Sequence, residues 1–270
     1  TISSQFVTAL LLIAPFTSTG IHLVFSGIPV SRPYFAMTIK MLKYFNIRIE
    51  QKSNEVAVWP KAQLPPKTLT IEPDWTSASY WIGAAGLLPG SQFFFPGISK
   101  RSWQGDQAIL DLTRGFGLQP KYTAEGLQVT SNEQLPRTFE GFLTDHPDLV
   151  PTLVAICTAA RVPFSLMGLG HLRDKDTDRL AALSNEMSRV GADIRATADT
   201  LSCDQYREPH QGEITIHTYN DHRMAMSAVI LALKYRELTI ANPEVVSKSY
   251  PDFWHQLAKA GFAFHQNEEQ

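Results

Sequence analysis

The sequence predicts an α/β protein with a mixed sheet, because one order of helices and strands recurs along its 270 residues. Three segments share a pattern: a helix end, an Asn or Gly that stops the helix, and two alternating strands around a polar turn. These segments are residues 42–59, 113–130 and 187–204. Their stops, Asn46, Gly117 and Gly191, are 71 and 74 residues apart, which indicates an internal repeat.

Each hairpin follows the same elements, so the repeating unit reads helix, strand, helix, strand, strand. The short strands include residues 21–27 and 162–168, and a helix is expected at residues 175–190. A fourth, partial copy places its stop, Gly261, 70 residues after Gly191. We therefore expect sheet faces that pack against shared helices.

The composition is that of a globular protein of one large or two medium domains, with 44% hydrophobic residues. A boundary is expected near residues 70–74, where a Pro-rich segment leads into a new strand. The net charge of −2 gives no general attraction to nucleic acid or to an anionic membrane. The longest apolar stretch, residues 6–16, is too short to span a bilayer. We expect neither nucleic acid nor membrane as a partner.

The cysteines indicate the redox compartment of the protein, and the first residue bears on whether the chain is part of a longer one. Cys157 and Cys203 lack the spacing of a metal or redox motif, so they are expected to be free structural thiols in a reducing compartment, the cytoplasm. The chain opens at Thr1, already inside a helical pattern, and is expected to be a piece of something longer.

Polar residues precede the apolar helix expected in "HTYNDHRMAMSAVILAL", residues 217–233. Asn220 or Asp221 can cap this helix, and the free backbone N–H groups of its first turn can hold an anion. Arg223 adds a positive fork at the same end. The alternative interpretation is ordinary capping beside a solvated arginine.

A second polar group lies in "GHLRDKDTDRL", residues 170–180, after an apolar strand and a Gly-rich bend. A helix that starts near Asp174 would place Lys175 and Arg179 on one face, with Asp176 beside Arg179. A strand-to-helix turn directs the helix N-terminus at a crevice. The alternative is a surface helix with ion pairs.

Further polar residues precede other apolar helices, and we expect these helix starts to converge. Asp148 follows Pro147 as a cap or as a base, and Lys248 lies between two serines. Capping or phosphate binding also suits Ser3, Ser4 and Gln5. The spacings of His210, His217 and His222 match no metal-ligand pattern, so no metal site is predicted.

The chain resembles the 3-phosphoshikimate 1-carboxyvinyltransferase (EPSP synthase) family from Ser3 to about Leu257. The resemblance is carried, in order, by "SSQF", "SRPY", "EPDWTSASYW", "QGD", "HPDLVPT", "DKDTDRL", "YNDHRMAM" and "SKSYPDFW". It implies the enolpyruvyl transferase fold, an inverse α/β barrel of repeated βαβαββ units. Residues 1–71 would be the remnant of an N-terminal substrate-binding domain, and residues 72–270 most of the second domain.

The resemblance also implies a reaction in aromatic amino acid biosynthesis. The enolpyruvyl group of phosphoenolpyruvate passes to the 5-hydroxyl of shikimate 3-phosphate and phosphate is released, without metal or organic cofactor. The implied partners are these two small molecules and a missing N-terminal half, in a protein that is a monomer when complete.

Residue roles implied by the resemblance fall into three groups. Proton transfer and catalysis would involve Asp148, Asp176 and Lys175. Shikimate 3-phosphate would be held by Ser3, Ser4, Gln5, Ser31, Tyr34, Asp148, His171 and Lys175. Phosphoenolpyruvate would be held by Gln5, Asp176, Arg179, His222, Arg223 and Lys248.

Two residues depart from the family pattern and leave alternatives open. Asp176 stands where Glu is usual, which shortens the proposed acid and base by one methylene, and His171 stands where Asn is usual. A non-catalytic relative or fragment that binds shikimate 3-phosphate is therefore one alternative. The other is UDP-N-acetylglucosamine enolpyruvyl transferase, which generally lacks the N-D-H-R-M-A-M stretch.

Overall fold

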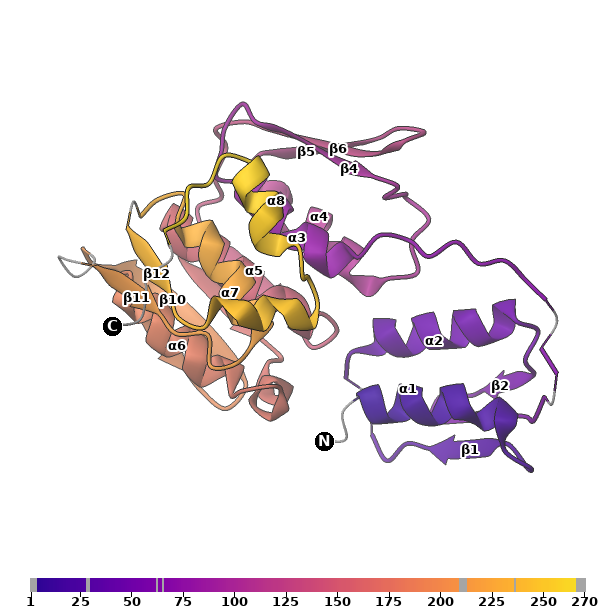
Figure 1. Cartoon of the computed structure of the whole chain (residues 1–270). Helices are drawn as coiled ribbons and strands as arrows, with labels where there is room; N and C mark the ends of the chain where they lie inside the picture. Colours follow the sequence, from indigo (N-terminus) through magenta and orange to yellow (C-terminus); the bar gives the residue numbers. More distant parts are fainter. Residues whose placement is uncertain are drawn as a thin grey trace.

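A computed structural model describes residues 4–27, 30–61, 63–64, 66–208, 213–235 and 237–265. Its helices and strands follow the repeat predicted from the sequence, and the α/β class is confirmed (Figure 1). The four positions predicted to stop helices, Asn46, Gly117, Gly191 and Gly261, all have the left-handed backbone that ends a helix, with φ between 58° and 97°.

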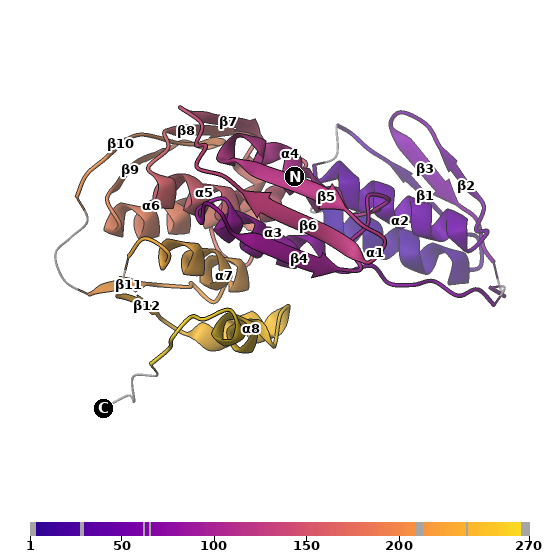
Figure 2. The ribbon, with the colours of Figure 1, turned by 90° about the horizontal axis from the view of Figure 1, so that it is seen from above.

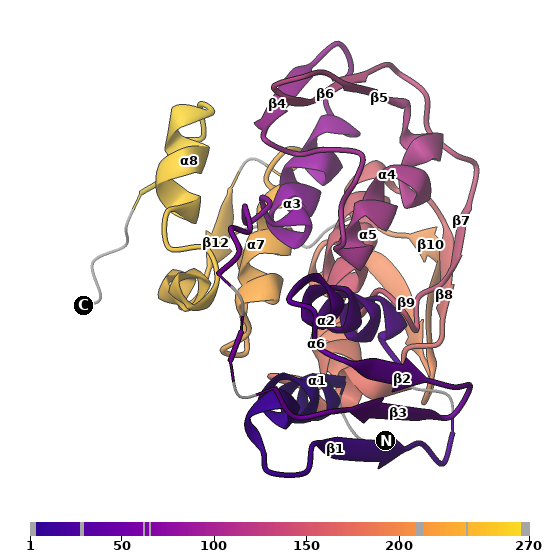
Figure 3. The ribbon, with the colours of Figure 1, turned by 90° about the vertical axis from the view of Figure 1, so that its right-hand side faces the viewer.

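The first repeat has two helices on one face of an antiparallel sheet of order β1-β3-β2 (Figure 3). Its apolar interior includes Leu11, Phe35 and Val56 and is separate from the core of the rest of the chain. The elements are α1 Ser4–Ile13, β1 Ile21–Val24, α2 Arg32–Tyr44, β2 Ile49–Gln51 and β3 Glu55–Val58.

The second repeat begins directly with a helix, so the strand expected near residues 70–74 is wrong. Residues 66–74 form no helix or strand; Pro66 and Pro73 lack the N–H that a sheet ladder needs. The sheet of this repeat is antiparallel, of order β4-β6-β5. Its elements are α3 Trp75–Ala85, β4 Gln92–Pro96, α4 Ile109–Leu112, β5 Leu118–Tyr122 and β6 Gly126–Ser131.

The third repeat forms a mixed sheet of order β7-β8-β10-β9, with β7 parallel to β8. The helices α5 and α6 lie along one face of it (Figure 2). The elements are β7 Phe139–Phe142, α5 Val150–Ala160, β8 Phe164–Met167, α6 Arg179–Arg189, β9 Ala192–Ala196 and β10 Thr200–Tyr206.

The helix predicted at residues 175–190 begins later, at Arg179. Residues Gly170–Asp174 form a 3-10 helix and Lys175 is extended, because Asp178 caps α6 by accepting a hydrogen bond from Ala181 N. The sequence had suggested that Lys175 and Arg179 are neighbours on one helix face. This prediction is wrong, because Lys175 precedes the helix.

The last repeat has a two-stranded parallel sheet, β11 and β12, and the buried helix α7 connects the two strands. After α8 and Gly261, the described residues 262–265 form no strand. The elements are β11 Ile214–Ile216, α7 His222–Leu231, β12 Leu238–Ile240 and α8 Phe253–Lys259. Among the helices described, none is both long and apolar enough to cross a membrane.

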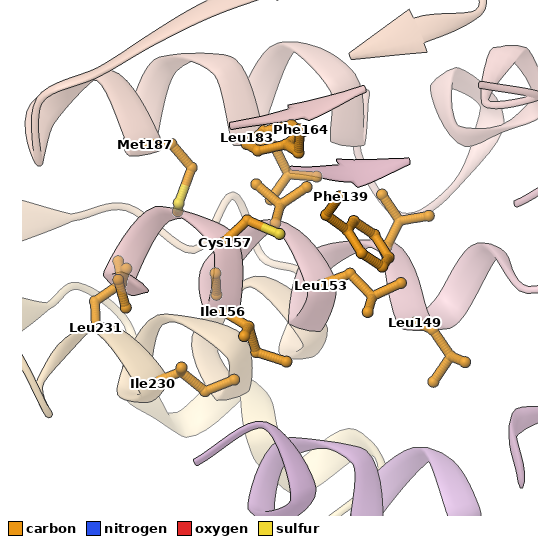
Figure 4. Close-up of a cluster of buried hydrophobic side chains, with 14 of the residues drawn as sticks. Phe139, Leu149, Leu153, Ile156, Cys157, Phe164, Leu183, Met187, Ile230 and Leu231 are labelled. Carbon is orange, nitrogen blue, oxygen red and sulfur yellow. The ribbon is translucent and has the colours of Figure 1, made fainter. Parts of the chain in front are cut away.

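The main core surrounds α5, whose residues 150–159 are all buried. Figure 4 shows Cys157 on the side of Phe164 and Leu153 beside Phe139, while Ile156 faces Ile230 of α7. A helix buried on all sides has a fixed position, so the residues at its N-terminal end are fixed as well.

Candidate active site

The N-terminal ends of three helices meet at one ionic cluster, as the sequence had suggested. Asp148 lies in the 3-10 helix Pro147–Leu149 that leads into α5, Arg179 is the first residue of α6, and Arg223 is the second of α7. Asp148 Oδ1 accepts a hydrogen bond from Arg179 Nη1 at 3.0 Å, and Asp148 Oδ2 accepts one from Arg223 Nη2 at 2.8 Å. The carboxylate thus joins two arginines on different helices.

Asp148 does not cap a helix, so the capping alternative for this residue is wrong. The residue before α5 is Leu149, which makes no side-chain cap, and the Asp148 side chain points to the arginines instead. Pro147 and Pro151 lack N–H groups in this first turn, which reduces the need for a capping side chain.

Asp221 caps α7 by accepting a hydrogen bond from Arg223 N at 2.9 Å, which is one of the two capping options that the sequence allowed. It also accepts one from Arg179 Nε at 2.7 Å. Both Asp221 and Arg179 are buried, with 0% and 2% of their surface exposed. A single carboxylate therefore orients α7 and the guanidinium of Arg179 together.

The pKa values of this cluster follow from burial and from the opposing charges. Burial acts to raise the pKa of Asp148, but Arg223 and Arg179 outweigh it and bring the pKa to about 2. Burial acts to lower the pKa of Arg179, but Asp221 and Asp148 outweigh it. At neutral pH Asp148 is therefore a carboxylate between two permanent cations.

A second ion pair lies beside the cluster, between Lys248 and Asp176. Lys248 Nζ donates to Asp176 Oδ2 at 2.5 Å, and His222 Nδ1 lies 3.5 Å from the same oxygen. Burial acts to raise the pKa of Asp176, but the hydrogen bond and charge of Lys248 lower it. Burial, then Arg223, lower the pKa of the His222 imidazole. This ion pair connects the segment before α6, which carries Asp176, to the 3-10 helix Pro243–Lys248.

Asp176, Asp221 and His222 are close enough to ligate one cation, since their ligand atoms lie within 4.8 Å of one another. Lys248 and Arg179 already neutralise the two carboxylates. We therefore assign no metal to this group.

Lys175 and His171 are close enough to the cluster for its charges to affect their pKa values. Burial lowers the pKa of Lys175, and Asp148 is the largest charge that opposes this effect. Burial and Lys175 together lower the pKa of His171. Lys175 is thus a cation that faces Asp148 without a direct hydrogen bond among the contacts described.

Residues 31–34 of the first repeat contact the loop at residues 144–148. Ser31 N donates to Thr144 O at 3.1 Å, and Arg32 pairs with Asp145. Tyr34 Oη lies 3.1 Å from Asp148 Oδ2. The first repeat therefore adds a hydroxyl to the ionic cluster.

The remaining expected ligands are less completely placed. Ser3 and the side chain of Ser4 lie outside the described residues, and Gln5 is in the first turn of α1. Ser31 is buried in a left-handed conformation, with φ of 57°.

Sequence reasoning missed the role of Asp106, the last residue of the quoted "QGD". Only 2% of its surface is exposed, and its Oδ2 lies 2.5 Å from Thr76 Oγ1 and 3.0 Å from Tyr34 Oη. Tyr80 is buried against Arg223, and burial raises its pKa to about 12. Asp106 could have been noticed in the sequence, because it is a charged residue in a family motif to which no role had been given. No feature of the sequence singled out Tyr80.

A cavity of about 860 Å³ opens onto this cluster. Tyr34, Asp106, Asp148 and Arg223 line this cavity together with residues 69–74. Its charged lining residues are Arg101, Arg223, Glu72, Asp74, Asp106 and Asp148. Within this mixed lining, the guanidinium fork of Arg223 suits the carboxylate or phosphate group of a small ligand.

Solved structures that match this fold include EPSP synthases and a further enolpyruvyl transferase. An EPSP synthase structure from Acinetobacter baumannii matches with a TM-score of 0.72 at 19% identity, covering 96% of this chain and 61% of that chain. The enolpyruvyl transferase NikO from Streptomyces tendae matches with a TM-score of 0.68 at 20% identity, covering 93% of this chain and 57% of that one. These likenesses define the fold.

The chain belongs to the EPSP synthase (3-phosphoshikimate 1-carboxyvinyltransferase) family, whose model matches residues 1–257. A 3-phosphoshikimate 1-carboxyvinyltransferase of Bacteroides fragilis strain YCH46 is 36% identical over 99% of this chain and 66% of its own length. One from Methanospirillum hungatei is 32% identical over 96% of this chain and 60% of its own length. The chain thus spans just under two thirds of the length of these relatives.

Proposed function

We propose that this chain carries much of the active site of an EPSP synthase within a longer protein. That protein transfers the enolpyruvyl group of phosphoenolpyruvate to the 5-hydroxyl of shikimate 3-phosphate, giving 5-enolpyruvylshikimate 3-phosphate and phosphate. The observation that carries the proposal is the pair of ion pairs that Asp148 forms with Arg179 and Arg223 at the N-terminal ends of three helices. Phosphate release by the full-length protein, with both substrates required, is the direct test.

Phosphoenolpyruvate is proposed to bind at the N-terminal ends of α6 and α7. The guanidinium forks of Arg179 and Arg223 match its carboxylate and phosphate oxygens, and Lys248 supplies a further positive charge. Gln5, Asp176 and His222 complete the proposed set. The ligand oxygens would take over hydrogen bonds that the arginines now make to Asp148.

Shikimate 3-phosphate is proposed to bind between the first repeat and the Asp148 loop. Tyr34 already contacts Asp148 across this junction. Lys175 and His171 face the same region and offer a cation and a hydrogen-bond donor for the phosphate. The remaining proposed ligands are Ser3, Ser4, Gln5 and Ser31.

Asp148 is the proposed acceptor of the proton of the attacking hydroxyl. Its low pKa keeps it in the carboxylate form that can accept this proton. As the hydroxyl oxygen bonds to the enol carbon, the methylene carbon takes up a proton from the Lys175 ammonium, or from Asp176 after that carboxylate has itself accepted a proton. Loss of phosphate and return of that proton then restore the double bond.

Arg223→Ala is expected to weaken phosphoenolpyruvate binding by about 1.5 to 3 kcal/mol, because a charge-assisted contact is lost. Binding of shikimate 3-phosphate should change much less. Calorimetry with each substrate measures both affinities, and Arg195→Ala, from an exposed ion pair with Asp204, is the control. Equal loss for both substrates would contradict the donor assignment.

Asp176→Glu tests whether the short carboxylate is matched to its surroundings. Asp176 already reaches Lys248 and His222, which favours a backbone adjusted to the shorter side chain. We expect the longer side chain to lower turnover by about tenfold to a hundredfold, with shikimate 3-phosphate affinity nearly unchanged. Higher turnover would show instead that the short arm limits proton transfer.

A non-catalytic relative that binds shikimate 3-phosphate is the second candidate, favoured by Asp176 and His171 at positions where the family differs. It predicts binding of that substrate without phosphate release. Membership of the EPSP synthase family argues against UDP-N-acetylglucosamine as the acceptor.

The full-length protein is proposed to be a cytoplasmic monomer that includes an N-terminal half beyond this chain. The buried thiols of Cys157 and Cys203 suit a reducing compartment. The helix α1 exposes Phe6 and Ile13, 67% and 54% of whose surface is accessible. An apolar helix face of this kind calls for a covering element, which further repeats would provide.

A further inference from the structure

We propose that Glu186 is a positioning residue for the anion site, acting through the segment 217–223. The inference rests on the proposed function and deepens it, because it identifies what holds the phosphoenolpyruvate ligands in place. Glu186 lies on α6 and is 0% exposed, and its hydrogen bonds and ion pair among the described residues go to His217, Tyr219 and Arg189.

The carboxylate of Glu186 holds the segment with both of its oxygens. His217 N donates to Oε2 at 2.9 Å, and Tyr219 Oη donates to Oε1 at 2.6 Å. Arg189, one turn further along α6, balances the charge through a contact of 3.1 Å to Oε2. Two donors separated by a single residue are thus fixed by one buried group.

The segment needs such a restraint because its backbone is unfavourable. Tyr219 and Asn220 have φ values of 53° and 57°, in the left-handed region that non-glycine residues rarely adopt. Consecutive residues in this region persist only where surrounding contacts enforce them. Asp221 N donates to Thr218 O at 2.9 Å and closes the turn.

The helix α6 also contacts the segment 217–223 through a second side chain, Arg179. Arg179 precedes Glu186 by two helical turns, so both side chains lie on one face of α6. Arg179 binds Asp221 while Glu186 binds residues 217 and 219. The position of Asp221 sets the start of α7, and hence the place of Arg223.

Amide hydrogen exchange tests the positioning step without any substrate. In Glu186→Ala, the amides of Asp221 and Arg223 should exchange about tenfold faster or more, since the turn loses both anchors. The control is Glu208→Gln, at a carboxylate that is 88% exposed. Unchanged exchange at these two amides would overturn the proposal whatever the protein binds.

Substrate affinities test the functional step in the full-length protein. Glu186→Ala should raise the KM for phosphoenolpyruvate about tenfold or more, with the KM for shikimate 3-phosphate within about threefold. Glu186→Gln keeps an acceptor oxygen and should recover most of the affinity. Both KM values rising equally, or only the folded fraction falling, would reduce Glu186 to a stabilising residue and overturn the proposal.

The two measurements separate this inference from the proposed function. Wild-type protein that binds no phosphoenolpyruvate overturns the proposed function, and with it the substrate part of the inference. Wild-type protein that binds it, beside a Glu186→Ala variant with unchanged affinity, overturns the inference alone.

Discussion

Replacing Asp221 by alanine is expected to lower the free energy of unfolding by about 3 to 5 kcal/mol, because it leaves a buried guanidinium without its main partner. Asp221 and Arg179 are both almost fully buried, and their contact is 2.7 Å. The same change removes the cap of α7, which alone is worth about 1 kcal/mol. Denaturant unfolding of the variant and of the wild type measures the difference.

Two further variants separate the charge from the cap. Asp221→Asn keeps a side-chain oxygen that can cap α7 but removes the charge opposite Arg179, so it should retain about 1 kcal/mol more stability than Asp221→Ala. Asp204→Ala breaks the exposed pair with Arg195 and should cost about 1 kcal/mol or less. A loss for Asp221→Ala as small as that for Asp204→Ala would show that the pair is solvated.

The sequence was sufficient for the repeat because the repeat depends on local chemistry. Alternating apolar residues and helix stops such as Gly117 and Gly191 act within a few residues, and a regular interval does not depend on long-range contacts. Asp221 as a cap is equally local, since the carboxylate and the amide of Arg223 are two residues apart.

The contacts between the N-terminal ends of different helices could not be predicted from local sequence patterns. Asp148 binds Arg179 and Arg223, which are 31 and 75 residues away, and the spacing of residues says nothing about such pairs. For the same reason the sequence left a cap or a base as alternatives for Asp148, and the structure does not show the cap. The late start of α6 has a related cause. Three aspartates, Asp174, Asp176 and Asp178, all suit the start of a helix, and the choice of Asp178 depends on the docking of Arg179.

Family resemblance supplied roles that neither spacing nor composition carried. It singled out Tyr34, whose hydroxyl reaches Asp148 across the junction with the first repeat. It gave no role to Asp106 or Glu186, whose buried carboxylates act on other side chains and on backbone. Groups of this kind are visible only once burial and partners are known.

The 270-residue chain by itself is expected to show no measurable transferase activity, whereas a protein of the full length of its relatives should release phosphate. Two polyanionic substrates require positive and hydrogen-bonding groups that close on them from both sides. The cluster around Asp148 offers one side, and the first repeat adds Tyr34 through a small junction. Phe6 of α1 and Phe16 of the 3-10 helix that follows it are exposed, 67% and 66% respectively, at the surface where further repeats would pack.

Complementation provides the decisive form of this experiment. The proposed N-terminal half, made separately and mixed with the chain, should cover α1, reduce aggregation and restore phosphate release. Phe6→Ser together with Phe16→Ser should improve the solubility of the chain alone but weaken complementation, because the same apolar surface serves both. Robust turnover by the isolated chain, with mass spectrometry excluding any copurified remainder, would show that one side suffices and would refute the two-sided site.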